Sequence, residues 1–287
     1  MNTAYLNGDY MPLAETRVSV MDRGFLFGDG VYEVIPVYAH RPFRLSEHLQ
    51  RLQNSLDGIR IANPHSPAEW SEIIQRIIGT ADSANQQVYI QVTRGPIDVR
   101  NHAFPEHATP TVLVLTEPLV PPKAELLASG TAAVSAADIR WLRCNIKSTS
   151  LLANCLLRQL AVDAGCAETV LFRDGILTEG AAANIFAVKN GMLLAPQKNH
   201  LMLPGVTYDV VLEIAARNHI SVVVRDISDA EVRSADELLM TSSTREVLPI
   251  VTLDGRAVGT GLPGPVTLQL AAAYQDFKRT VMQGEQA

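Results

Sequence analysis

Lysine is scarce in this chain of 287 residues, and none occurs before position 123. The five lysines are Lys123, Lys147, Lys189, Lys198 and Lys278. Four of them lie in polar or turn-like sequence, which is typical of solvated side chains. Lys147 lies instead in the segment 139–148, just before a long apolar helix pattern. It is therefore the lysine best placed for a chemical role.

Basic runs and long apolar runs are also absent from the sequence. The net charge is −6, and without a basic cluster nucleic acid is not expected as a partner. No apolar stretch approaches the roughly 18 residues that a membrane helix needs. The first residues lack a basic region followed by an apolar region, so we expect no signal peptide.

Cysteine and metal-binding patterns add two further exclusions. The three cysteines form no CxxC pair, which favours reduced thiols in a cytoplasmic protein. The seven histidines show no HExxH-type spacing, so no metal site is predicted. Apolar residues make up 47% of the chain and charged residues 19%. This apolar content is enough for a substantial core, in two domains or in one large one.

The first part of the chain reads as strands followed by helices and further strands. Asn7-Gly8 predicts a hairpin over 4–10, and the glycines of 24–30 predict a bend before a strand at 31–38. Helices are predicted from a cap at Ser46 and from Pro67. Strands at 87–93 and 111–116 are joined by the loop 94–110, whose length favours a functional role.

The second part mixes hairpins and helices after a proline-rich linker. The predicted domains are 1–117 and 125–287, with a linker at 118–124. Hairpins are expected at Asp174-Gly175 and Asn190-Gly191. The other predicted elements are strands at 131–137, 222–224 and 238–241 and helices at 150–163, 203–218 and from 266. The fold class is therefore α/β with mixed sheets and two domains.

Lys147 has two interpretations on its local sequence. Burial disfavours the charged form of an amine, and this is how a lysine becomes a nucleophile that forms a Schiff base. The alternative is a partly buried lysine that pairs with Asp138 or Glu179.

Other candidate groups are scattered along the chain, and each has a structural alternative. Glu179 at a strand end suits a protonated pyridine nitrogen, or is an ordinary acid. The helix start at 204–207 and the hydroxyls of 242–244 suit a phosphate, or are plain caps and turns. Arg51 on a leucine-rich helix face needs an anionic partner. Arg100 and His102 suit one carboxylate, or belong to a solvated loop.

Taken together, these segments resemble the fold-type IV pyridoxal-phosphate enzymes, and among them most closely the D-amino-acid aminotransferases. The resemblance runs across nearly the whole chain. Its densest stretches are 22–34, 92–95 with 100–102, 138–148, 178–184 and 203–207. It implies a smaller N-terminal α/β domain, a larger C-terminal pseudo-barrel domain that binds the cofactor, and a homodimer with the active site at its interface.

The resemblance assigns roles residue by residue. Lys147 would form the Schiff base with pyridoxal 5'-phosphate and shuttle the proton, and Glu179 would face the pyridine nitrogen. Arg140 and Glu33 would lie beside the cofactor's phenolic oxygen. The phosphate would be held by Arg51, Val206, Thr207 and Thr244. Tyr32, Arg100 and His102 would form a trap for the substrate carboxylate, with the arginine and histidine supplied by the partner subunit.

The implied reaction is a ping-pong transfer of an amino group from a D-amino acid to 2-oxoglutarate or pyruvate. Within the family, a branched-chain L-amino-acid aminotransferase, an (R)-amine transaminase and an aminodeoxychorismate lyase are alternatives, and a non-catalytic cofactor carrier is one outside it. The sequence departs from the family pattern at 181–183, where alanines replace common serines, and at Tyr208, where arginine is common. Both departures bear on substrate range or cofactor retention.

Overall fold

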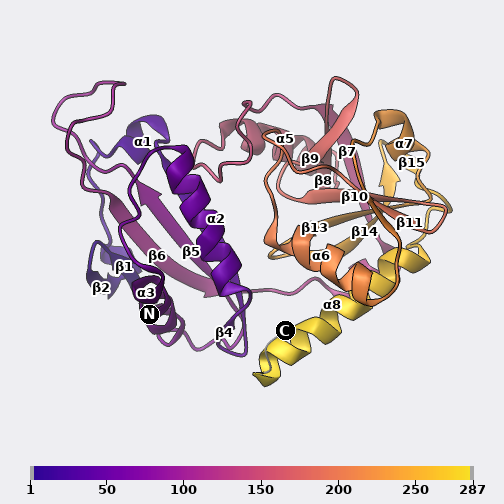
Figure 1. Ribbon diagram of the computed structural model, residues 1–287, viewed down its shortest axis with the longest axis horizontal. Helices are drawn as coiled ribbons and strands as arrows, with labels where there is room; N and C mark the ends of the chain where they lie inside the picture. Colours follow the sequence, from indigo (N-terminus) through magenta and orange to yellow (C-terminus); the bar gives the residue numbers. More distant parts are fainter. Residues whose placement is uncertain (1–2, 285–287) are drawn as a thin grey trace. The chain divides into compact units, whose positions relative to one another are not determined.

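The computed structural model describes residues 3–284 and divides into two compact units. One unit contains the chain up to Val120 together with Ile146–Leu151, and the other contains Pro121–Asn145 and the chain from Leu152 onward. The division falls inside the predicted linker 118–124, and the predicted domain limits themselves stay a prediction. Figure 1 shows the helices and strands of each unit.

The segment Ile146–Leu151 belongs to the N-terminal unit although it follows the linker in sequence. The backbone explains this, because Tyr32 N–H donates to the Lys147 carbonyl at 2.9 Å and Val31 pairs with Ser148. Ile146 is buried in the core of that unit. Lys147 is therefore held against a strand from the first part of the chain.

The N-terminal unit is built on a six-stranded antiparallel sheet with the order β2-β1-β6-β5-β3-β4. The predicted hairpin at Asn7-Gly8 and the predicted strands are confirmed. The strands are β1 (Thr3–Leu6), β2 (Asp9–Pro12), β3 (Gly30–Tyr38), β4 (Arg41–Pro42), β5 (Gln86–Thr93) and β6 (Thr111–Pro118). A short 3-10 turn, Leu13–Glu15, follows β2. The loop 94–110 contains no helix or strand, as predicted.

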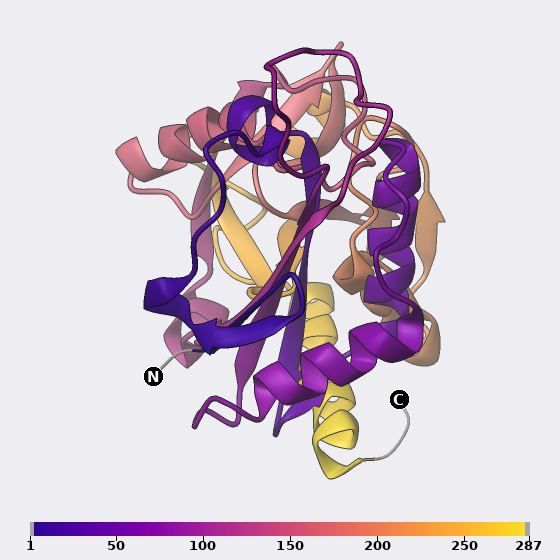
Figure 2. The same cartoon turned by 90° about the vertical axis from the view of Figure 1, so that its left-hand side faces the viewer.

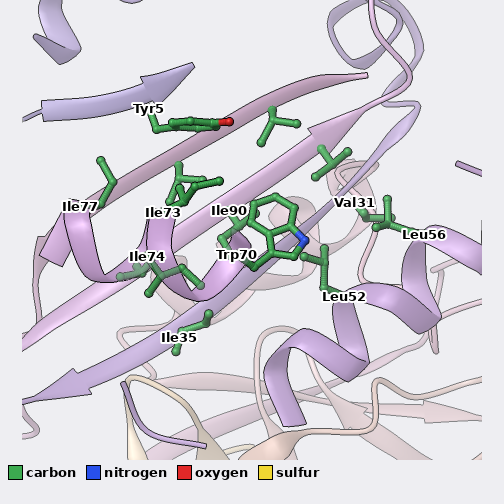
Figure 3. Close-up of a cluster of buried hydrophobic side chains, with 14 of the residues drawn as sticks. Tyr5, Val31, Ile35, Leu52, Leu56, Trp70, Ile73, Ile74, Ile77 and Ile90 are labelled. Atoms are coloured by element: carbon green, nitrogen blue, oxygen red, sulfur yellow. The ribbon is translucent and has the colours of Figure 1, made fainter. Parts of the chain in front are cut away.

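Two helices, α2 (Leu45–Gly58) and α3 (Pro67–Ile78), pack against this sheet. Figure 3 shows Trp70 of α3 close to Leu52 of α2 and Ile90 of β5. Trp70 is 1% exposed, and large side chains buried in this way each contribute about 1.5–3 kcal/mol to stability. Because β3 and α2 share this core, the residues that they carry are held in fixed positions.

Of the two predicted helix starts, one is confirmed and the other is wrong. The start of α3 at Pro67 is confirmed, and Ser66 and Glu69 form a capping box there. The predicted cap at Ser46 is wrong, since α2 begins at Leu45 and Arg44 precedes it in the left-handed conformation with φ 52°. The Ser46 hydroxyl donates to Glu47 instead of capping the helix.

The predicted bend at 24–30 contains a short helix, α1 (Arg23–Phe27). The Asp22 carboxylate caps it by accepting from Gly24 N–H at 2.7 Å, and Gly28 ends it with φ 65°. A Cβ at Gly24 would lie 2.2 Å from the Thr93 side chain. The glycine is therefore required by the close approach of α1 to the end of β5.

The C-terminal unit is built on a curled nine-stranded mixed sheet with the order β12-β11-β10-β13-β14-β7-β8-β9, and β15 pairs with β14. The pairs β11–β12, β14–β7 and β7–β8 are parallel, and the others are antiparallel. The strands are β7 (Thr131–Ala137), β8 (Glu168–Arg173), β9 (Ile176–Gly180), β10 (Asn184–Lys189), β11 (Met192–Ala195), β12 (Val222–Val224), β13 (Glu237–Ser242), β14 (Glu246–Leu253) and β15 (Arg256–Ala257). The fold class, mixed α/β with a small N-terminal sheet and a curled C-terminal half-barrel, is confirmed.

Helices cover this second sheet. They are α4 (Ala124–Ser129), α5 (Leu152–Asp163), α6 (Val206–Arg217), α7 (Asp229–Arg233) and α8 (Pro265–Gln283). The strand β14 is not among the strands predicted from the sequence, and it contains Pro249, a residue that is uncommon inside a central strand. Among residues 3–284, no helix is both long and apolar enough to cross a membrane.

Candidate active site

Lys147 is held by its backbone beside an aromatic ring. Its N–H donates to the Ser55 hydroxyl at 3.2 Å, and its carbonyl accepts from Tyr32. The Lys147 ammonium lies 4.2 Å from the centroid of the Tyr32 ring. Within the described part of the N-terminal unit, no carboxylate forms an ion pair with this amine. The amine is thus held beside an aromatic ring, with no ion-pair partner among the residues of this unit that the structure describes.

A buried group of charges lies on β3 and α2 in the same unit. The Glu33 carboxylate is fully buried and accepts from Arg51 Nε at 2.9 Å and Arg51 Nη2 at 2.5 Å. His48 Nδ1 lies 3.0 Å from Glu33. Burial raises the pKa of Glu33, but Arg51 and His48 outweigh it and hold the pKa below its usual range. Arg51, predicted to bind phosphate, is thus paired with the acid predicted to lie beside the phenolic oxygen.

His48 interacts electrostatically both with this group of charges and with Lys147. Burial lowers the pKa of His48, and the positive charges of Arg51 and Lys147 lower it further, against the opposing effect of Glu33. The ring nitrogen Nε2 is buried and has no hydrogen-bond partner among the described residues. His48 was not singled out in the sequence, where one histidine beside Glu47 gave no signal.

The three residues predicted to trap a carboxylate are only partly brought together. The Tyr32 ring stacks on Tyr89 at 5.7 Å, beside Lys147. Arg100 and His102 both approach the ring of Phe27 in α1, at 4.9 Å for the guanidinium carbon and 5.2 Å between ring centroids. Both side chains are exposed. The predicted pair therefore converges on one ring within this chain, as an extended loop allows.

The loop that carries this pair is anchored by a buried arginine. The guanidinium of Arg23 donates to the carbonyls of Asn101, His102 and Ala103 at 2.5, 3.1 and 3.2 Å. Its Nε donates to Asp29 at 2.7 Å. The sequence predicted no role for Arg23. The available signal was an arginine between the cap at position 22 and a required glycine.

Asp29 also binds Arg94 at the start of the same loop. Arg94 donates to both Asp29 oxygens and to the carbonyls of Ile59 and Arg60. Burial raises the pKa of Asp29, but Arg94 and Arg23 outweigh it and hold the pKa below its usual range. The Arg94 guanidinium lies 3.6 Å from the centroid of Phe104. The loop 94–110 is therefore fixed at several points despite its lack of regular structure.

In the C-terminal unit, Glu179 is buried near the end of β9 within a hydrogen-bonded network. It accepts from Arg140, from Asn184 Nδ2 at 3.2 Å and from Leu203 N–H at 3.1 Å. Burial raises the pKa of Glu179, and Arg140 opposes this effect. Asp138 also pairs with Arg140. Arg140 thus contacts the acid predicted to face the pyridine nitrogen.

This network leads to the start of α6, which is the predicted phosphate site. The Asn184 amide donates to the Leu203 carbonyl at 3.0 Å, and a Cβ at Gly205 would lie 2.1 Å from Asn184 Oδ1. Helix α6 has no side-chain cap, and Thr207 in its first turn is 4% exposed. An uncapped start of a twelve-residue helix suits an anion, since its first amides lack partners within the helix.

The remaining predicted residues lie close to this helix in sequence or in the sheet. Val206 is the first residue of α6 and is buried. Thr244 lies in the turn between β13 and β14, and α6 packs against β13. Tyr208, the departure from the family pattern, is buried, stacks on Phe186 at 4.8 Å and donates to the Pro196 carbonyl at 2.7 Å. Its hydroxyl thus has a structural role.

Comparison with known proteins identifies the family of this chain. The family model described as amino-transferase class IV matches residues 30–253. The chain belongs to this family. A D-alanine aminotransferase of Bacillus licheniformis is 37% identical to the aminotransferase described here over 94% of this chain and 95% of the relative. A D-alanine aminotransferase of Staphylococcus epidermidis is 35% identical over 96% of this chain and 98% of the relative.

Solved structures with the same fold include branched-chain amino acid aminotransferases. One from Escherichia coli has a TM-score of 0.89 and 27% identity to this class IV aminotransferase, and the match covers 96% of this chain and 94% of that one. Another, from the organism abbreviated T.th. and determined with pyridoxamine 5'-phosphate, has a TM-score of 0.91 and 26% identity, covering 99% and 95%. The family model and the sequence relatives therefore show the family, and the solved structures show the fold.

Proposed function

We propose that this chain transfers the amino group of a D-amino acid to a 2-oxo acid in a ping-pong reaction that uses pyridoxal 5'-phosphate. The observation that carries the proposal is Lys147, an amine over the Tyr32 ring at 4.2 Å with no ion-pair partner in the described part of its unit. The relatives named D-alanine aminotransferases support the choice of D-amino acids.

The lysine has the chemical properties that the reaction requires. Bound pyridoxal phosphate supplies an electron sink that weakens the Cα–H bond of an amino acid. Lys147 Nζ would hold the cofactor and, once free, its amine would act as the base that takes the Cα proton of the substrate. Its backbone bonds to Tyr32 and Ser55 keep it in place during this step.

The C-terminal unit contains groups that fit the rest of the cofactor. Glu179, supported by Arg140 and Asn184, offers a carboxylate to the ring nitrogen. The amides of Val206 and Thr207, together with the hydroxyl of Thr244, offer donors to the phosphate. This assignment is supported by the uncapped start of α6, where an anion is favoured by both the amides and the helix dipole.

Substrate handedness is assigned to Arg100 and His102. Two groups that converge on a carboxylate fix one side of an amino acid while its amine lies at the lysine. Their approach to the single ring of Phe27 supports this assignment. An amine without a carboxylate would gain little from such a pair.

The proposed assembly is a homodimer. Leu152, Leu156 and Leu160 recur every four residues on α5 and are 75%, 55% and 47% exposed. An exposed apolar stripe of this kind is typical of a protein interface. A second copy is the partner that the proposed function requires, because it would supply Arg100 and His102 to the other active site.

A donor panel tests the proposal. The cofactor-loaded protein is mixed separately with D-alanine, D-glutamate, L-leucine and (R)-1-phenylethylamine, and loss of the visible cofactor band is followed. We expect both D-amino acids to bleach the band and Lys147→Ala to abolish turnover. Lys198→Ala, which removes an exposed amine paired with Asp209, serves as the control and should keep wild-type rates.

The second candidate is a branched-chain L-amino-acid aminotransferase, which the solved structures with TM-scores of 0.91 and 0.89 favour. Bleaching by L-leucine and not by either D-amino acid would establish it and overturn our choice of substrate. Near-normal turnover by Lys147→Ala would contradict both candidates.

A further inference from the structure

We propose that Arg23 is a positioning residue for substrate recognition: it fixes the backbone of 101–103 so that Arg100 and His102 are presented to the substrate carboxylate. The inference rests on the proposed function, in which those two side chains bind the carboxylate. Arg23 itself would touch neither substrate nor cofactor. Its effect would pass through the loop.

The hydrogen bonds that Arg23 donates to the loop all reach the segment that carries Arg100 and His102. Its two terminal nitrogens reach the three consecutive carbonyls of Asn101, His102 and Ala103. Arg23 is 3% exposed, so its donors are shielded from water, and hydrogen bonds from a charged donor are stronger than neutral ones. Arg100 precedes the first of these carbonyls and His102 carries the second. The backbone of both residues therefore has little freedom to shift.

The guanidinium is itself held in one orientation. Asp29 binds Nε at 2.7 Å and thereby directs the two terminal nitrogens toward the loop. Asp22 caps the helix that carries Arg23 and also accepts from the hydroxyls of Thr93 and Thr111 at 2.7 and 2.6 Å. Helix α1 is consequently tied to the ends of β5 and β6, between which the loop runs. Figures 1 and 2 show α1 at the same end of the sheet as this loop.

The same helix also supports the recognition side chains. Phe27 is four residues after Arg23, so the two side chains lie on one face of α1. The Arg23 guanidinium carbon lies 4.8 Å from the Phe27 ring, and Arg100 and His102 approach that ring as well. One short helix thus holds the loop backbone through Arg23 and both recognition side chains through Phe27.

Lysine is the informative substitution at position 23. Arg23→Lys keeps the positive charge but loses the forked donors that bind several carbonyls at once. We expect the KM for D-alanine to rise about tenfold, the change produced by misplacing one charge-assisted contact, with little change in kcat. The half-reaction with (R)-1-phenylethylamine, which has no carboxylate, should keep its wild-type rate. Asp29→Asn should also raise the KM for D-alanine, by less, and should leave the half-reaction with (R)-1-phenylethylamine unchanged.

Two further variants separate the possible outcomes. Arg76→Lys alters an exposed guanidinium that lies over Tyr10 at 3.7 Å in the same unit, and should change nothing. Arg100→Ala should reproduce the KM effect. If Arg100→Ala leaves the KM unchanged, the proposed carboxylate site is wrong and the role of Arg23 falls with it. If Arg100→Ala raises the KM and Arg23→Lys does not, or if Arg23→Lys slows both donors equally, only the positioning role is overturned.

Limited proteolysis tests the loop without using activity. Trypsin cleaves after arginine, and Arg100 is exposed. Releasing the carbonyls of 101–103 should make cleavage after Arg100 several-fold faster in Arg23→Lys than in Arg76→Lys, as judged by the masses of the fragments. Equal cleavage rates in the two variants would overturn the claim that Arg23 holds the loop, whatever the substrate.

Discussion

Four arginines illustrate how much depends on single side chains in this protein. Arg23, Arg51, Arg94 and Arg140 are all less than 10% exposed, and each is paired with a buried or partly buried carboxylate. Removing one partner from such a pair is costly, because it leaves a desolvated charge behind. At Arg51 and Arg140 the paired acid, Glu33 or Glu179, is itself one that we assign to cofactor binding.

The pair of Glu33 and Arg51 gives a prediction about stability and pH. Glu33→Gln removes the carboxylate that balances Arg51 and should lower the free energy of unfolding by about 3–5 kcal/mol at pH 7. The folded-state pKa of Glu33 lies below its ordinary value of 4.5, so the unfolded chain takes up this proton first as the pH falls. The stabilisation is complete above pH 4.5 and is lost below it by about 1.4 kcal/mol per pH unit.

Denaturant unfolding of the wild type and Glu33→Gln between pH 3 and pH 7 checks this prediction. The difference between the two proteins should be constant at the upper end and should shrink toward pH 3. Glu72→Gln, an exposed acid on α3, is the control and should stay within about 0.5 kcal/mol of the wild type throughout. A difference that grows on acidification would contradict the assigned direction.

At this scale, the sequence indicated which residues could take part in the chemistry. It did not indicate which side chains pair with them. Lys147 was identified by its rarity and its apolar context. The pairing of Arg51 with Glu33, and of Arg140 with Glu179, joins residues 18 and 39 positions apart. No local pattern reports such pairs, because each depends on two elements packing together.

Among the secondary-structure elements, the start of α6 shows how a helix terminus is prepared for a ligand. Gly205 lies against the amide of Asn184, which in turn holds Glu179. The two groups that we assign to opposite ends of the cofactor ring are therefore coupled within one unit.

Gly205→Ala tests this coupling. The added Cβ would lie 2.1 Å from Asn184 Oδ1 and should displace that side chain. Overpacking of this kind costs about 1–3 kcal/mol, so we expect reduced stability and an affinity for pyridoxal phosphate weaker by about tenfold. Absorbance titration of the cofactor-free protein measures the affinity. Gly79→Ala is the matched control, since that glycine has an ordinary helical φ of −67° and room for a Cβ. Identical affinities would refute the coupling.

Two of the elements that sequence patterns missed, α1 and β14, share one property. Helix α1 has five residues, one of them a glycine, and β14 contains a proline. Both have poor local propensity and form because packing and hydrogen bonds elsewhere outweigh it. The hairpins at Asp174-Gly175 and Asn190-Gly191, by contrast, were predicted correctly, because those residue pairs specify the turn themselves.

For the whole molecule, the proposed homodimer predicts that active sites are shared. At D-alanine concentrations well below the wild-type KM, Lys147→Ala should be inactive, and Arg100→Ala should keep only about a tenth of the wild-type rate because of its raised KM. In the proposed homodimer, the loop that carries Arg100 reaches the active site of the other chain. One site of every mixed dimer then contains both wild-type residues, because each chain supplies the residue that the other lacks. Random mixing makes half of the dimers mixed, with one of two sites intact, so about a quarter of wild-type activity should return.

The mixing experiment requires unfolding and refolding of the two variants together, or their co-expression with two tags. Light scattering after size-exclusion chromatography should show dimers in all samples. The control mixes Lys147→Ala with wild-type protein whose Arg76 is changed to lysine, for which activity should fall only in proportion to dilution. Mixed dimers without recovered activity would place Arg100 in the same chain's site and refute the exchange.

The sequence by itself determined the elements whose signals are local and the identity of the chemical groups. The hairpin turns, the start of α3 at its capping box, Lys147 and the start of α6 after Pro204-Gly205 could all be predicted, because neighbouring residues specify them. Only the tertiary structure decided that Lys147 belongs with the N-terminal sheet, that Arg51 pairs with Glu33, and that Arg23 holds the loop of Arg100 and His102. The physical reason is that a buried charge takes whichever partner the packed elements bring to it.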